Sequence, residues 1–251
     1  MKESTIATSF GPAEMMVVTM ARMVRNDELT FVGVNSPLPF VAVSLARRLH
    51  APRTTFLTVA GGLDVTPHRL IANTSSSELA VGTAAIFDNQ EIYGLSGRGR
   101  IDLTFLGMAQ IDIHGRVNSS YLGEHANPRM RFPGGGGAPA IMPMAKRVVL
   151  WRAGHSRRIF VPEVEFVTST GNLHRVVTSK CVFKFENGRL LVESIHTGVS
   201  AAEVADLTGF DVPGIEAAAL TPAPTSEELR ILAEVDPTGV RYVEFGDQVK
   251  T

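Results

Sequence analysis

The sequence predicts an α/β protein built on an open, mainly parallel sheet with flanking helices. Two observations support this. Short apolar runs bounded by turn-forming residues recur along the chain, and helical repeats separate the first of them. With 251 residues, of which 44% are hydrophobic and 20% charged, the chain can bury a large core. We expect one domain over residues 1–251, with a C-terminal extension from about residue 198.

The first expected element is an amphipathic helix over residues 13–24, where apolar residues recur at helical spacing. Gly11 and Pro12 fit the N-cap and first helical positions, and Glu14 fits the third. Strands and helices then alternate. We expect a strand over 29–33, a helix over about 40–49 and a strand over 55–59.

This order of strand, helix and strand is typical of a parallel sheet with a crossover helix. The centre of the chain then becomes rich in short apolar runs of strand length. Further strands are expected over 101–106, 147–150, 160–161, 166–168, 182–185 and 190–195.

The C-terminal third predicts a β-hairpin and two capped helices. Asn187 and Gly188 lie between the last two runs, and Asn-Gly is the strongest short hairpin signal. Ser200 fits the N-cap of one helix, with Glu203 completing a capping box, and Thr225 opens another. The sequence therefore predicts a C-terminal hairpin followed by helices.

Composition excludes several classes of function. Lys plus Arg total 24 against 25 Asp plus Glu, so the chain has no strong positive potential that would attract nucleic acid or an anionic membrane surface. The single cysteine, Cys181, can form neither an intrachain disulfide nor a multi-cysteine metal site, and no histidine pair has metal-ligand spacing. We expect no metal, no membrane-spanning segment, no secretory signal and a cytoplasmic location.

Four consecutive glycines are the first candidate site. The backbone N–H groups of Gly134, Gly135, Gly136 and Gly137 can approach a ligand closely and point in one direction, as binding of a phosphate or an oxyanion requires. The run matches neither the Walker pattern nor GxGxxG, and a flexible surface loop is an equal alternative from the run alone.

A second candidate follows an expected buried strand. Asp112, Asn118 and Ser119 are polar residues where an open α/β sheet binds ligands, at the carboxyl ends of its strands. A tight turn held by Asp112 and Asn118 is the favoured alternative. Glu124 and His125 have acid–base chemistry, but neighbours in sequence rarely face one another.

The third candidate is the end of the strand over 55–59. A strand end followed by glycine is a good seat for a catalytic side chain, yet Val59 and Ala60 before Gly61 carry no chemistry. Asp64 has a carboxylate that can act as a base, but a turn role is the more typical one.

Taken together, these segments resemble the β-type subunit of the class I coenzyme A transferases, most closely the glutaconate CoA-transferase branch. The matching segments occur in order over nearly the whole chain. They include Val32-Gly33, Pro39 to Pro52, Ala109 to Asp112, Gly115, Val117 to Ser119, Arg131-Phe132 with the glycine run, Phe166 to Ser169, Val177-Thr178, Thr208 to Asp211 and Asp236-Pro237.

The resemblance implies an open, three-layer α/β fold, an α-type partner chain in an α2β2 or larger hetero-oligomer, and acyl-CoA substrates. Coenzyme A would be part of the substrate, and no permanently bound cofactor is implied. It also implies that Gly134, Gly136 and Gly137 face the thioester and form an oxyanion site. We expect further substrate contacts from Gly135 and from two pairs of residues near the strand ends, namely Ala60, Gly61, Asn118 and Ser119.

One departure from the family pattern decides the expected reaction. The family's nucleophile is a glutamate at the end of the second strand, and by spacing that position is Val59, which cannot be a nucleophile. The steroid ring-cleaving hydrolases, a related branch, also lack this glutamate. There the working carboxylate belongs to the α-type partner, and water cleaves a carbon–carbon bond of a cyclic β-ketoacyl-CoA.

We therefore expect a catabolic hydrolase or retro-Claisen lyase subunit. One alternative is a CoA-transferase that moves CoA between carboxylic acids. The other is a ligand-sensing module of related fold, which the near-neutral charge and the lack of a DNA-binding segment argue against.

Overall fold

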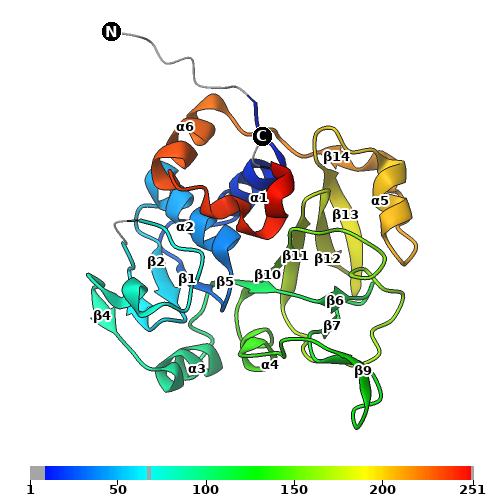
Figure 1. Ribbon diagram of the computed structural model, residues 1–251, viewed down its shortest axis with the longest axis horizontal. Coiled ribbons are helices and arrows are strands. Elements are labelled where there is room, and N and C mark those ends of the chain that lie inside the picture. The colour runs from blue at the N-terminus through cyan, green and yellow to red at the C-terminus, as the bar shows by residue number, and fades with distance from the viewer. Residues whose placement is uncertain (1–8, 67–68, 250–251) are drawn as a thin grey trace.

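The computed structural model describes residues 9–66 and 69–249, and their main feature is a ten-stranded sheet (Figure 1). Its strands, in spatial order, are β14 (Ala219–Leu220), β13 (Arg189–Ile195), β12 (Cys181–Glu186), β11 (Leu173–Thr178), β10 (Arg147–Arg152), β5 (Leu103–Gly107), β1 (Leu29–Val32), β2 (Thr55–Thr58), β3 (Gly62–Leu63) and β4 (Ala85–Ile86). Two small ribbons accompany it, β6 (Gln110–Ile111) with β7 (Val117–Asn118) and β8 (Tyr121–Gly123) with β9 (Pro128–Arg131).

The helices surround this sheet. They are α1 (Pro12–Ala21), α2 (Pro37–Leu49), α3 (Asn89–Gly97), α4 (Ala138–Ile141), α5 (Ala201–Leu207) and α6 (Ser226–Val235), with 3-10 turns η1 (Ser77–Ala80), η2 (Ile215–Ala217) and η3 (Val240–Val249). None of the helices within the described ranges is long and apolar enough to cross a membrane.

The centre of the sheet is parallel and its ends are largely antiparallel. β1 pairs in parallel with β2 and β5, and β10 pairs in parallel with β5 and β11. Towards the ends, β11, β12 and β13 pair antiparallel, as do β2, β3 and β4. The α/β fold expected from the sequence, with α2 crossing over between β1 and β2, is confirmed.

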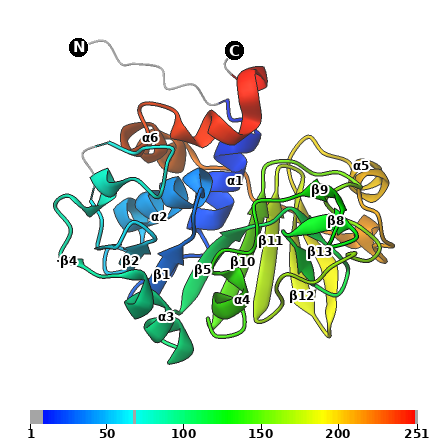
Figure 2. The same ribbon diagram turned by 60° about the horizontal axis from the view of Figure 1, so that its bottom comes forward.

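Two layers of apolar side chains lie on opposite faces of the sheet. One face packs against α1, α2, α6 and η3, and its core includes Met16, Phe40 and Phe56. The other packs against α3, α4 and α5 and includes Phe160 and Phe183. Figure 2 shows α1, α2 and α6 on one side of the sheet and α3 and α4 on the other, which is the expected three-layer arrangement.

Local sequence signals place several boundaries correctly. Glu14 accepts a hydrogen bond from the Gly11 backbone N–H at 2.9 Å, so α1 begins as expected. Asn187 and Gly188 have φ of 52° and 74° in the β12–β13 turn, the left-handed geometry that an Asn-Gly hairpin needs. Thr225 caps α6 in a complete capping box.

Other expectations were wrong. No strand forms over 166–168, where Phe166 and Val167 are exposed, and the expected strand at Phe160 is a single bridge to Ile111. Phe160 packs into the core from a loop, whereas Phe166 lies against the Tyr121 ring outside the core, so neither residue extends the sheet. Ser200 caps α5, but Glu203 makes an ion pair with Lys180 instead of closing the capping box.

The expected C-terminal extension packs against two separate parts of the molecule, one edge of the sheet and the helices α1 and α2. β14 pairs with β13, while α6 packs on α2 and is held to α1 by Arg22, whose Nε donates to Glu228 at 2.7 Å. A single domain over the whole chain stays a prediction.

Candidate active site

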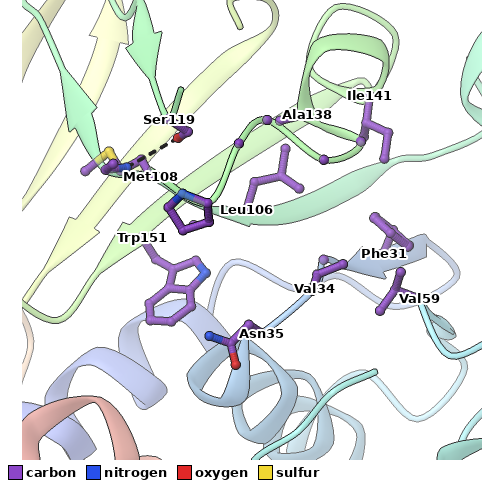
Figure 3. A pocket seen from close by; sticks show the side chains of 18 of the residues that line it. Phe31, Val34, Asn35, Val59, Leu106, Met108, Ser119, Ala138, Ile141 and Trp151 are labelled. Carbon is purple, nitrogen blue, oxygen red and sulfur yellow. Dashed lines mark hydrogen bonds between the residues drawn. The ribbon is translucent and has the colours of Figure 1, made fainter. Parts of the chain in front are cut away.

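A cavity of about 430 Å³ lies at the carboxyl ends of the central parallel strands (Figure 3). Gly33 after β1, Val59 after β2, Gly107 at the end of β5 and Arg152 at the end of β10 all line it. Open α/β sheets bind ligands at this edge, because the loops that leave the strands there diverge to opposite faces. The cavity is therefore the strongest candidate for an active site in the described part of the chain.

The glycine run lines this cavity from Gly134 to Gly137. The Gly134 N–H donates to the carbonyl oxygen of Ser119 at 2.7 Å, which ties the run to the loop that follows β7. Gly137 is the N-cap of α4. The run is thus anchored at both ends, and the alternative of an untethered surface loop does not describe it.

The three amides after Gly134 have no acceptor among the described residues. The N–H groups of Gly135, Gly136 and Gly137 take part in no hydrogen bond there. Backbone N–H groups in a cavity that are not bonded to the protein are available to a ligand oxygen. The arrangement can stabilise negative charge on such an oxygen.

The glycines of the run are needed for different reasons. A Cβ on Gly135 would lie 2.7 Å from the Thr168 Cγ2, and one on Gly137 would lie 2.9 Å from the Ile141 Cδ1, so a side chain at either position would have to displace a neighbouring side chain. Around Gly136 no atom lies within 4 Å of such a Cβ, but its φ of 50° is left-handed. Packing restricts the first two positions and backbone conformation restricts the third.

Val59 follows β2 directly and lines the same cavity. It packs with the apolar core on that face, and Figure 3 shows it near Phe31 and Val34. The strand end where a carboxylate nucleophile would sit is therefore hydrocarbon in this chain.

The other predicted contacts divide between cavity and interior. Ser119 lines the cavity, but Ala60, Gly61 and Asn118 do not. Asn118 is fully buried, and its Nδ2 donates to the Tyr121 carbonyl at 2.8 Å. It is a turn residue, which is the alternative that the sequence favoured.

Two of the remaining candidates have structural roles, and the other two lie outside the cavity. Asp112 is fully buried and accepts from the Arg116 Nε at 2.8 Å, and Asp64 accepts from the Phe56 N–H at 3.0 Å. Glu124 and His125 are exposed and do not line the cavity. The structure thus brings together Val59, Ser119 and the glycine run and leaves the other predicted polar groups elsewhere.

Several lining residues were not foreseen from the sequence. Trp151 and Arg152 end β10, Asn35 follows β1 with φ of 50°, and Glu244 comes from η3. Arg152 and Glu244 are the charged side chains among the described lining residues. A tryptophan and an arginine at a strand end were the only available signal, whereas Glu244 is brought in by packing of η3 on α1 and α2.

Comparisons with known proteins agree with this geometry. The family model described as Coenzyme A transferase matches residues 13–206. The chain is 33% identical to the B subunit of 3-oxoadipate CoA-transferase from Pseudomonas knackmussii, over 91% of this chain and 94% of the relative. It is 28% identical to the B subunit of glutaconate CoA-transferase from Acidaminococcus fermentans, over 97% and 98% of the two chains.

Two solved structures are similar to the whole fold. A chain of the decarboxylase AibA/AibB superposes with a TM-score of 0.89 at 31% identity, covering 94% of this chain and 99% of that one. A chain of IpdAB from Rhodococcus jostii superposes with a TM-score of 0.80 at 27% identity, with the same coverage. The IpdB subunit of that organism is described as a cholesterol ring-cleaving hydrolase.

Proposed function

We propose a function for this chain from the premise that it belongs to the coenzyme A transferase family, as the match over residues 13–206 shows. The proposed function is that of the β-type chain of a heteromeric enzyme that cleaves a carbon–carbon bond of an acyl-CoA thioester with water. The observation that carries it is Val59, which lines the same cavity as the glycine run but offers no carboxylate.

A partner chain is part of this proposal. The relatives and similar structures are B subunits or chains of two-component enzymes, namely AibA/AibB and IpdAB. We expect an α-type chain to supply the catalytic base, in an α2β2 or larger assembly.

The proposed step balances without a covalent enzyme intermediate. The partner's base removes a proton from water, and the hydroxide adds to the β-keto carbon of the acyl group. The bond between that carbon and the α-carbon breaks, and its electron pair forms the thioester enolate, which is then protonated at carbon. Amides of Gly135, Gly136 and Gly137 would stabilise the enolate oxygen, each such donor being worth roughly 3 kcal/mol in a transition state.

A CoA-transferase remains the second candidate, and a specific observation favours it. The similarity to the 3-oxoadipate CoA-transferase chain extends over 91% of this chain. Such a reaction passes through an acyl-enzyme whose nucleophile comes from elsewhere than Val59, and Glu244 is the carboxylate that this chain offers among the described lining residues. The two candidates therefore differ in a measurable intermediate.

The test uses the complex with its partner and 2-oxocyclohexanecarbonyl-CoA, a cyclic β-ketoacyl-CoA, in water labelled with oxygen-18. We expect one labelled oxygen in the new carboxylate of the ring-opened product, with CoA retained on it. Trapping with hydroxylamine should leave the peptides that contain Val59 and Glu244 unmodified.

Two results would overturn the hydrolase. One is CoA exchange between two acids with ping-pong kinetics and no solvent oxygen, together with a hydroxamate on Glu244. The other is decarboxylation of an acyl-CoA that carries a free carboxylate, with no oxygen-18 in the remaining acyl-CoA product. The complex would then have the activity of its decarboxylase relative.

A further inference from the structure

Trp151 carries a polar atom that the fold buries without a partner. It is the penultimate residue of β10, its exposed fraction is 3%, and its Nε1 has no hydrogen-bond partner among the described residues. Buried indole N–H groups ordinarily find an acceptor, because a buried donor without one loses its hydrogen bonds to water and gains nothing in return. Trp151 is one of six buried side chains whose polar atom has no partner among the described residues, and it is the one of the six that lines the cavity.

The indole lines the candidate active site. Figure 3 shows its nitrogen on the side of the ring that faces the open space between Leu106 and Val34. Gly107 pairs with Trp151 on the neighbouring strand, and a Cβ at that position would lie 4.0 Å from the Nε1. Gly107 therefore places no side chain between the nitrogen and the cavity, although the Nε1 atom itself exposes less than 1 Å² of surface.

A second donor lies next to it. Arg152 also lines the cavity, and its Nη1 donates to the Met108 carbonyl at 3.4 Å. Most of the other wall residues nearby, such as Phe31, Leu106 and Ile141, are hydrocarbon. The end of β10 is thus a donor-rich spot in a largely apolar cavity.

We propose that the Trp151 N–H donates a hydrogen bond to an oxygen of the acyl group, separate from the thioester oxygen, and so determines specificity. This inference rests on the proposed function, because it presumes that the cavity takes an acyl-CoA. The oxygen is that of a ketone or a carboxylate, and in either case an unsubstituted alkyl chain would leave the donor unpaired. A buried donor that stays unpaired discriminates against a ligand that lacks the acceptor.

The experiment compares six-carbon CoA thioethers, which cannot turn over, on the complex with its partner. The probes are S-hexyl-CoA, S-(3-oxohexyl)-CoA, S-(5-oxohexyl)-CoA and S-(5-carboxypentyl)-CoA, and calorimetry gives each Kd. The variant is Trp151→Phe, which keeps most of the ring and removes the N–H. Met108→Leu, another buried lining residue without a hydrogen-bonding group at issue, is the matched control.

We expect the wild-type complex to bind at least one oxygen-bearing probe about 10-fold more tightly than S-hexyl-CoA. In Trp151→Phe this preference should fall below about 2-fold through loss of affinity for the oxygen-bearing probe, while S-hexyl-CoA binds as before. Met108→Leu should keep the preference. The keto and carboxylate probes show which oxygen is recognised.

A second measurement does not depend on the variant. Trp151 is the only tryptophan of this chain, so nitrogen-15 labelling of this chain alone gives one indole N–H resonance in the complex. The indole proton should shift downfield with the preferred oxygen-bearing probe and stay in place with S-hexyl-CoA.

The outcomes separate this inference from the proposed function. If all probes bind but without preference, or the indole resonance responds equally to S-hexyl-CoA, the role of Trp151 is wrong and the acyl-CoA site stands. If neither CoA nor any thioether binds the complex, the proposed function fails first.

Discussion

Two regions of this molecule hold clusters of polar groups, and they differ in whether those groups have partners. One is the cavity at the carboxyl edge of the sheet. The other, which we call the histidine cluster, is formed by His155, Thr178, Cys181, His196 and Thr208 in the interior near β11 and β12.

Every ring nitrogen in the histidine cluster is paired. His155 contacts the hydroxyls of Thr178 at 3.0 Å and Thr208 at 3.1 Å, and it stacks on Phe160. His196 contacts the Thr178 carbonyl at 2.9 Å and the Thr221 hydroxyl at 3.0 Å. Burial lowers the pKa of both histidines to about 4, so both rings are neutral near pH 7.

The same burial makes the side chains of this region unreactive. Burial raises the pKa of the Cys181 thiol to about 12, so the nucleophilic thiolate does not form near pH 7. In the cavity, by contrast, the amides of Gly135, Gly136 and Gly137 and the Trp151 indole lack partners among the described residues. Paired groups in a closed interior stabilise the fold, whereas unpaired donors in an open cavity are available to a ligand.

The largest effect that tests this contrast is expected at Gly136. We expect Gly136→Val to lower turnover by the complex at least about 100-fold, because a side chain at φ of 50° displaces the backbone donors. The matched control is Gly188→Val in the β12–β13 turn, which also has a left-handed φ and no atom within 4 Å of the place that a Cβ would take. That variant should lose stability but keep its rate.

The two variants are compared by steady-state rate and by circular dichroism of the assembled complex. If Gly136→Val keeps its fold and a near-wild-type rate, the glycine run is a surface loop after all. If both variants lose activity equally, the loss reports backbone strain and not the position of the amides.

The sequence predicted those parts of the fold that depend on neighbouring residues and missed parts that depend on long-range packing. Elements with local signals were found, such as α1 with Gly11 and Pro12 and the hairpin at Asn187, because caps and turns depend on neighbouring residues. The strand β11 was missed over Leu173–Thr178, since polar residues such as His174 and Arg175 interrupt its apolar pattern and its pairing with β10 is long-range.

The sequence predicted the loop and the strand end of the candidate site, but not the polar side chains that line it. Four glycines and the strand end at Val59 are visible as a pattern, and both line the cavity. Trp151 and Glu244 were missed because their role depends on which faces of distant elements meet. Asn118 was placed at the substrate, whereas its side chain holds a turn.

A medium effect, on stability and not on rate, is expected in the histidine cluster. His155→Phe keeps the stacking on Phe160 but removes the ring nitrogens from Thr178 and Thr208. Both hydroxyls keep a carbonyl acceptor, so we expect the free energy of unfolding to fall by only about 2 kcal/mol. The thermal midpoint should fall by roughly 4–8 °C at unchanged turnover, measured on the complex at fixed concentration. A large fall in turnover at an intact fold would contradict the division between the two regions.

The smallest effect is a change in how stability depends on pH. Burial and the nearby Lys180 lower the pKa of His155 from 6.5 to about 4, while Glu203 opposes them. Between those values the unfolded chain binds a proton that the folded chain does not, so stability falls as pH falls from about 6.5 towards 4 and is unaffected above that window. His174 and His196 have pKa values lowered in the same direction, so they make stability depend more steeply on pH.

The variant His155→Phe removes the contribution of one of these protons. Between pH 6 and 5 its free energy of unfolding should fall by about 1 kcal/mol less than that of the wild type. Thermal midpoints of the two complexes at pH 7.5, 6 and 5 should therefore converge as the pH drops. Parallel curves would mean that His155 takes up its proton without unfolding, and the cluster would then be open to solvent like the cavity.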